Sequence, residues 1–300
     1  MSLSAPADAR IALLALVLAS CATASTTGPS VDPDAQFAYD ARAPLDVTIA
    51  VAEAIPGGTI AALSFASPMA GRASGFLALP SGRGPFSAVV LMPGSNAPPS
   101  VMRPAALDLV QRGAAALAID QTQTRPGHRP LFTFTVADRD EAVATVIDLR
   151  RTLDLLATRP EIDTKRVGYW GFSHGAFLGG ILSGVDHRIR AYVLQSGGGA
   201  DYLLQNAPRN IADPEALARY RAAIASIDPV AYVGRAAPAA LLFQNGNQDR
   251  TYSDAGVAAW VAAGSAPKEI KRYPADHPLD TRAHEDALAF LRAALGLAGR

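Results

Sequence analysis

The stretch Arg166-Val-Gly-Tyr-Trp-Gly-Phe-Ser-His-Gly-Ala-Phe-Leu-Gly-Gly180 places a single serine, Ser173, between two glycines. An apolar run precedes this serine, and a run of small and apolar residues follows it. Residues 171–175 match the pattern G-x-S-x-G, in which the glycines relieve crowding where a strand reverses sharply into a helix. We therefore predict a strand over 167–170 and a helix over 176–182, with the Ser173 hydroxyl exposed between them.

Apolar runs of strand length alternate with helical stretches along the rest of the chain. The runs 88–92 and 114–119 contain no polar residue, which is typical of strands buried on both faces. The stretch 138–157 carries a single apolar stripe at helical spacing. This alternation predicts an α/β fold with a mostly parallel central sheet and helices on both faces. The other expected strands are 47–51, 60–65, 75–79, 191–194, 239–243 and 269–273, and the other expected helices are 104–112, 254–262 and 283–295.

A serine hydroxyl becomes a useful nucleophile only when a base accepts its proton. Ligands of parallel sheets bind beyond the carboxyl ends of the strands, so residues just after a strand are the candidates. His277 follows the expected strand 269–273, and we favour it as the base. The histidines that we rank below it are His128, His174, His187 and His284.

The base needs a carboxylate that holds its tautomer and stabilises the imidazolium. Asp249 follows the expected strand 239–243 and fits the chain order Ser, Asp or Glu, His that accompanies the G-x-S-x-G motif. Asp201, which follows the preceding strand, is the second choice. The carboxylates that we rank lower are Asp213, Asp228 and Asp276.

Acyl transfer also needs hydrogen-bond donors for the developing oxyanion. One expected donor is the backbone N–H of His174, the residue after the nucleophile. The second is expected in the loop after the strand 88–92. Pro93 has no N–H, so this donor is Ser95 or, alternatively, Gly94.

Composition excludes several classes of protein. The chain has 300 residues, of which 49% are hydrophobic, and this is enough for a large core in one or two domains. The net charge is zero and no basic run occurs, so nothing indicates a nucleic-acid partner. Cys21 is the single cysteine, which excludes an intramolecular disulfide and a cysteine-based metal cluster. The sequence implies neither a metal nor a cofactor.

Residues 1–20 look like a secretory signal peptide. A short polar start precedes the apolar run 11–19, which is far too short to span a bilayer. The following Leu18-Ala-Ser-Cys21 resembles a bacterial lipobox, which implies cleavage before Cys21 and a lipid on its thiol. Ordinary signal cleavage after 22–24 is the alternative. We therefore expect an exported protein, either a membrane-anchored lipoprotein facing the periplasm or the outside, or else a secreted or periplasmic protein.

Two segments follow the signal peptide, and the second contains an insert. Residues 21–42 are expected to form a lipid-anchored flexible tether, because 22–34 is rich in Ala, Ser, Thr, Gly and Pro. Residues 43–300 are expected to form a single globular domain. Within it, an insert at about 197–238 separates two core strands and contains apolar residues at helical spacing. These helices are expected to cover the site as a lid or simply to cover core.

Together these motifs resemble the α/β-hydrolase fold, and more closely its dienelactone-hydrolase-like and prolyl-oligopeptidase-like serine esterase branch. The matching stretches are 85–94, 163–176, 244–249 and 273–277. The resemblance implies hydrolysis of a small-molecule carboxylic ester through an acyl-enzyme on Ser173. Dienelactone hydrolases carry a cysteine at this position, so Ser173 favours ordinary ester substrates. These motifs are specific for the fold and say little about the substrate.

Two other functions compete with the esterase hypothesis. A serine peptidase of the same fold uses the same residues, although the sequence shows no propeller domain and only a short extension before the fold. A catalytically idle binding protein is the other alternative. Such a protein would be expected to lack a triad residue or the oxyanion turn. The sequence contains candidates for each of them, which disfavours this alternative.

Overall fold

The computed structural model describes residues 1–2, 34–69 and 71–298. The predicted signal peptide and Cys21 lie outside the described residues, apart from Met1 and Ser2. The residues from Asp34 onward belong to one compact unit. Among the described residues, no helix is both long and apolar enough to cross a membrane.

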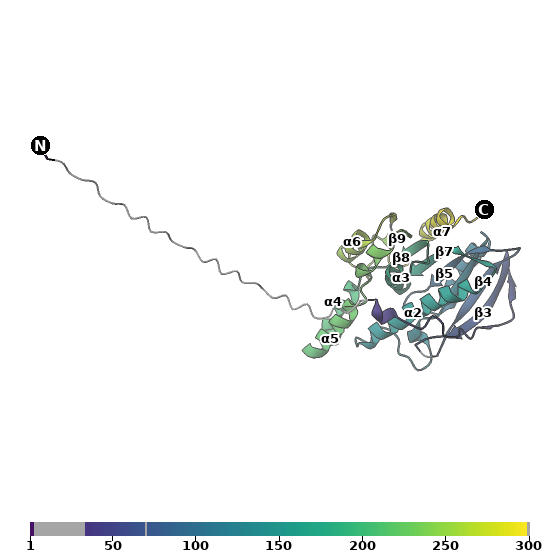
Figure 1. Ribbon diagram of the computed structural model, residues 1–300, viewed down its shortest axis with the longest axis horizontal. Coiled ribbons are helices and arrows are strands. Elements are labelled where there is room, and N and C mark those ends of the chain that lie inside the picture. Colours follow the sequence, from purple (N-terminus) through teal and green to yellow (C-terminus); the bar gives the residue numbers. More distant parts are fainter. Residues whose placement is uncertain (3–33, 70, 299–300) are drawn as a thin grey trace. The chain divides into compact units, whose positions relative to one another are not determined.

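A single sheet of ten strands forms the centre of the described unit (Figure 1). The strand order is β1-β3-β4-β6-β5-β7-β8-β9-β10, and β2 pairs with β3. Strands β5 to β10 pair in parallel, whereas β1 to β4 pair antiparallel and β4 joins β6 in antiparallel register. The strands are β1 (Thr48–Ile49), β2 (Glu53–Ile55), β3 (Gly58–Ala66), β4 (Arg72–Pro80), β5 (Phe86–Met92), β6 (Ala114–Ile119), β7 (Ile162–Phe172), β8 (Ala191–Gln195), β9 (Ala240–Gly246) and β10 (Lys268–Tyr273).

Helices cover both faces of this sheet. Helices α1 and α7 pack on one face, and α2, α3 and α6 pack on the other. The α-helices are α1 (Arg103–Val110), α2 (Ala137–Ala157), α3 (His174–Val185), α4 (Asp201–Asn210), α5 (Pro214–Ala225), α6 (Asp254–Ala263) and α7 (Thr281–Leu295). The short 3₁₀ helices are η1 (Ala35–Phe37), η2 (Pro99–Met102), η3 (Thr122–Thr124), η4 (Pro229–Ala231) and η5 (Val233–Arg235). The predicted fold class is therefore confirmed.

The alternation of side chains along β5 explains why its sequence is a continuous apolar run. Val90 and Met92 point into the core layer shared with α2 and α3. Val89 and Leu91 point into the layer shared with α1 and α7. Successive side chains of a strand point to opposite faces, so a strand covered on both sides has no position for a polar residue.

The described compact unit includes residues before 43, where we expected the globular domain to begin. Phe37 in η1 is completely buried in the core layer of α2. The side chain of Arg150 donates to the Phe37 carbonyl at 2.7 Å, and Arg151 donates to the Ala43 carbonyl at 2.7 Å. Two arginines of α2 thus bind backbone carbonyls of the segment that leads into the sheet. Tyr39 of the same segment packs against this core layer, and its hydroxyl donates to Asp154 at 3.0 Å.

The insert 197–238 forms α4 and α5, and its apolar residues serve both of the expected purposes. Tyr220 and Ile224 of α5 are buried in the core layer of α2 and α3. Tyr202 and Leu203 of α4 line a pocket beside Ser173. The insert therefore extends the core and also covers the candidate site.

Candidate active site

Ser173 sits at the tip of a strained turn between β7 and α3. Its φ of 53° and ψ of −115° lie in a region that non-glycine residues rarely occupy. A Cβ added to Gly171 would lie 2.3 Å from the Gly175 carbonyl oxygen, and one added to Gly175 would lie 2.2 Å from the Met92 carbonyl oxygen. Both glycines of the motif are therefore required by the close approach of backbone.

The structure brings together the three side chains that the sequence singled out. The Nε2 atom of His277 lies 2.7 Å from Ser173 Oγ, and its Nδ1 atom lies 2.8 Å from Asp249 Oδ2. The Asp249 side chain is only 3% exposed, and its other oxygen accepts the Thr251 N–H at 2.7 Å. The hydroxyl of Ser196 donates to the His277 carbonyl at 2.6 Å, which fixes the loop that carries the imidazole.

The competing carboxylates have other partners. Asp201 accepts a hydrogen bond from the Ser253 hydroxyl at 3.1 Å, and Asp228 caps η4. Asp276 accepts the backbone N–H of its neighbour His277 at 2.8 Å. Asp213 caps α5. Asp249 is thus the carboxylate that reaches the imidazole.

Two of the other histidines form pairs away from Ser173. His128 Nδ1 lies 2.7 Å from Glu141 Oε1. His284 Nε2 lies 3.0 Å from Asp108 Oδ2, and its ring packs on Trp170. The structure places His284 in the wall of a cleft beside Ser173. His187 is exposed.

The N–H groups of Ser95 and His174 are positioned to serve as oxyanion donors. Neither N–H donates a hydrogen bond to any group in the described part of the chain. The Ser173 carbonyl accepts from the N–H groups of Ala176 and Phe177 at 2.9 and 3.1 Å. Because the C=O and N–H of a trans peptide point in opposite directions, the His174 N–H points away from the helix. Ser95 lines both pockets that meet at Ser173, whereas Gly94 lines one of them.

Gln121 holds the loop that carries Ser95, and sequence reasoning missed it. This side chain is fully buried, and its Nε2 donates to the Pro93 and Gly94 carbonyls at 3.0 and 2.6 Å. Its Oε1 accepts a hydrogen bond from Gln123. The Gly94 carbonyl and the Ser95 N–H belong to one planar peptide, so fixing the carbonyl also fixes the N–H. The signal in the sequence was its position, two residues after the end of β6.

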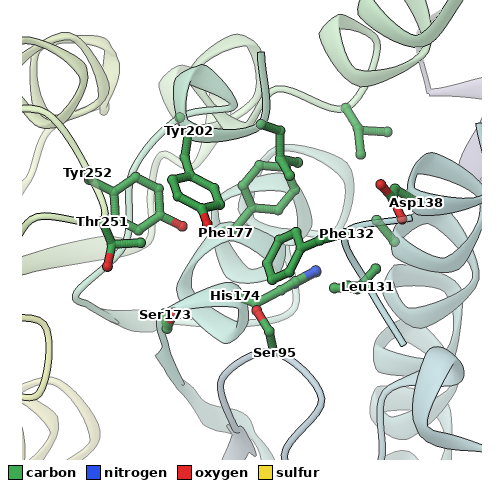
Figure 2. Close-up of a pocket in the computed structure, with 14 residues that line it drawn as sticks. Ser95, Leu131, Phe132, Asp138, Ser173, His174, Phe177, Tyr202, Thr251 and Tyr252 are labelled. Carbon is green, nitrogen blue, oxygen red and sulfur yellow. The ribbon is translucent and has the colours of Figure 1, made fainter. Parts of the chain in front are cut away.

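Two pockets of different character meet at Ser173. The more enclosed of the two, called the enclosed cavity below, has a volume of about 180 Å³ and runs from Ser173 and Ser95 to Asp138 (Figure 2). The other is an open cleft of about 580 Å³ that includes His277 in its wall. Figure 2 shows the rings of Phe132, Phe177 and Tyr202 gathered around the enclosed cavity.

His174 contributes its ring as well as its N–H to the enclosed cavity. Burial lowers the pKa of this imidazole to about 4, because no nearby carboxylate compensates the charged form. Its Nδ1 atom is buried and has no hydrogen-bond partner among the described residues. The ring packs against Phe177 at 5.5 Å between centroids. The ring is therefore neutral at physiological pH.

Solved structures of esterases have the same architecture. The acetyl xylan esterase from Paenibacillus sp. R4 superposes with a TM-score of 0.75 at 19% identity, covering 88% of this chain and 92% of that one. Acetyl xylan esterase 1 from Thermoanaerobacterium sp. JW/SL YS485 gives a TM-score of 0.75 at 17% identity, covering 87% and 92%. The fold is that of the α/β hydrolases.

Sequence comparison reaches less of the chain. The thiohydrolase apmlB from Arthrinium phaeospermum is 31% identical over 121 residues, which are 40% of this chain. The matched region spans 37% of that relative. No protein-family model matches the chain.

The strain at Ser173 leads to a prediction about stability. Replacing Ser173 by Ala keeps a Cβ at the unfavourable φ, whereas Ser173→Gly removes it. The strain amounts to about 1–3 kcal/mol, and the extra backbone entropy that glycine loses on folding offsets about 0.5–1 kcal/mol of its release. We expect Ser173→Gly to exceed Ser173→Ala in free energy of unfolding by about 1 kcal/mol. Urea unfolding of both variants measures the difference, and equal stability would mean that the turn is unstrained.

Proposed function

We propose that this chain is a serine hydrolase that cleaves carboxylic esters of small molecules through an acyl-enzyme intermediate. The observation that carries the proposal is the continuous hydrogen-bonded series from Ser173 through His277 to Asp249. A serine at a strained strand-to-helix turn with such a base beside it matches the arrangement needed for nucleophilic catalysis. Two N–H groups next to this serine have no hydrogen-bond acceptor among the described residues, and they could stabilise the developing oxyanion.

Acylation follows from the geometry of these groups. Ser173 Oγ attacks the ester carbonyl carbon while His277 Nε2 accepts the hydroxyl proton. Asp249 holds the Nδ1–H tautomer and stabilises the imidazolium. The carbonyl oxygen becomes an oxyanion that accepts hydrogen bonds from the N–H groups of Ser95 and His174. The intermediate collapses when His277 returns its proton to the leaving alcohol oxygen.

Deacylation uses the same groups in reverse. A water molecule takes the place of the alcohol, and His277 accepts its proton as the water attacks the acyl carbon. The second tetrahedral intermediate releases the carboxylic acid and restores the Ser173 hydroxyl. Ser173, His277 and Asp249 therefore end the cycle in the protonation states in which they began it.

The comparisons support ester substrates more than peptides. The two structural neighbours are named as esterases, and the relative with partial sequence similarity is named as a hydrolase. We place the chain in the dienelactone-hydrolase-like and prolyl-oligopeptidase-like branch because of the motifs over 163–176 and 273–277.

The first experiment measures hydrolysis of p-nitrophenyl esters by the purified protein and by Ser173→Ala. We expect the variant to lose at least about a thousandfold in kcat, because the nucleophile is absent. A fluorophosphonate should label the wild-type protein and leave Ser173→Ala unlabelled. Cleavage of peptide amides in place of esters would favour the peptidase. Absence of both turnover and labelling would favour the idle binding protein.

Gln121 is expected to act as a positioning residue for the oxyanion loop. In Gln121→Met the two carbonyls lose their donor, so the Ser95 N–H is no longer fixed. We expect kcat to fall by about 10- to 100-fold while KM changes little, because the lost interaction acts mainly on the transition state. Gln205→Met, an exposed glutamine of α4, is the matched control. A similar loss in the control, or an unchanged kcat in Gln121→Met, would contradict this role.

We also propose that the protein is exported and anchored to a bacterial membrane by a lipid on Cys21. The support is the apolar run 11–19 followed by Leu18-Ala-Ser-Cys21. Cys21→Ser removes the thiol that would carry the lipid, so we expect the esterase to move from the membrane fraction to the soluble fraction. Incorporation of labelled fatty acid into wild-type protein provides the second readout. Soluble wild-type protein without incorporated fatty acid would instead support ordinary signal cleavage and secretion.

A further inference from the structure

The two pockets at Ser173 differ in their access to the base. Ser173 and Ser95 line both the enclosed cavity and the open cleft. His277 lines the open cleft and does not line the enclosed cavity. A substrate bound at Ser173 therefore has a part on the His277 side and a part on the side of the cavity.

The chemistry of the proposed function assigns each part of an ester to one pocket. His277 Nε2 must lie within hydrogen-bond reach of the leaving oxygen in order to protonate it. The alcohol part of the ester must therefore occupy the open cleft. The acyl part extends from the same carbonyl carbon into the enclosed cavity.

The size of the enclosed cavity sets the size of the acyl group. Its volume is about 180 Å³. A protein cavity of about 150 Å³ is known to accommodate benzene. A single water molecule needs a cavity of only about 10–15 Å³ on the same kind of measure. A methyl group is similar in size to a water molecule, so an acetyl group would leave most of this cavity unfilled. A chain or ring of about six carbons would fill it.

The wall of the cavity selects for an uncharged acyl group. Leu131, Phe132, Phe177 and Leu203 contribute apolar surface. At the far end, the Asp138 carboxylate accepts hydrogen bonds from Thr133 and Phe134 of the neighbouring loop and from Tyr220 of α5. An acyl chain that ended in a second carboxylate would meet this negative charge. The His174 ring offers no compensating positive charge, because burial lowers its pKa to about 4.

We propose that the enclosed cavity binds a neutral, apolar acyl group of about six carbons, and that the alcohol lies in the open cleft. The proposal rests on the ester hydrolysis proposed above. It adds the class of substrate: esters of medium-chain or similarly sized aromatic carboxylic acids.

The acyl profile of kcat/KM tests the proposal. With p-nitrophenyl esters from acetate to dodecanoate, we expect kcat/KM to rise by about fourfold for each methylene up to hexanoate and to fall beyond octanoate. The mono-p-nitrophenyl ester of adipic acid has the hexanoyl chain length and a terminal carboxylate. We expect its kcat/KM to be at least about tenfold lower than that of the hexanoate, because of Asp138.

Variants at Leu203 move the expected optimum in opposite directions. Leu203→Trp fills the cavity and should shift the optimum to acetate or propionate. Leu203→Ala enlarges the cavity and should shift the optimum to octanoate or longer. This variant provides the test if Leu203→Trp does not fold. The matched control is Val101→Trp, an exposed residue of the open cleft, which should leave the acyl profile unchanged.

The outcomes separate this proposal from the proposed function. An optimum at acetate, or a profile that Val101→Trp shifts and the Leu203 variants do not, overturns the acyl assignment while ester hydrolysis stands. Equal rates for the hexanoate and the adipate monoester overturn the selection against charge. Absence of Ser173-dependent turnover, together with absence of fluorophosphonate labelling, overturns the esterase itself and this inference with it.

Discussion

The close contact between the start of α3 and the end of β5 is the constraint on which the rest of the site depends. A Cβ at Gly175 would lie 2.2 Å from the Met92 carbonyl oxygen and 2.8 Å from that of Pro93. Met92 also pairs with Gly171 in the parallel register of β5 and β7. The two strands therefore deliver Ser173 and the Ser95 loop to the same place. A side chain at Gly175 would clash with this backbone and would separate the Ser173 turn from the Ser95 loop.

Side chains at the ends of the neighbouring strands hold the loops that surround this contact. Gln121, after β6, fixes the loop of Ser95. Ser196, after β8, fixes the carbonyl of His277, and Asn245 of β9 donates to the Gly197 carbonyl at 2.8 Å. The carboxyl ends of parallel strands meet at one edge of a sheet, so each strand can supply a hydrogen bond to the next loop. These buried side chains therefore hold the loops in place through hydrogen bonds to loop carbonyls.

The sequence predicts the parts of this structure that depend on local pattern, and it misses those that depend on distant partners. Ser173 and the two flanking glycines predict the strand-to-helix turn, because few other residues fit its crowded backbone. Gln121 carries no such pattern, since a glutamine after a strand is equally suited to solvent. Its role depends on two carbonyls that lie 27 and 28 residues away in the chain. The anchoring of Phe37 depends likewise on Arg150, 113 residues later.

The two histidines near Ser173 differ in whether a carboxylate lies beside the ring. His277 has the Asp249 carboxylate at 2.8 Å, which in the proposed mechanism stabilises the charged imidazole during proton transfer. The buried ring of His174 has no carboxylate partner among the described residues, and burial lowers its pKa to about 4. In the proposed mechanism, a proton taken from Ser173 therefore goes to the histidine that faces the leaving group. The ring of His174 stays neutral and leaves the enclosed cavity without a positive charge. The backbone N–H of the same residue is the proposed oxyanion donor.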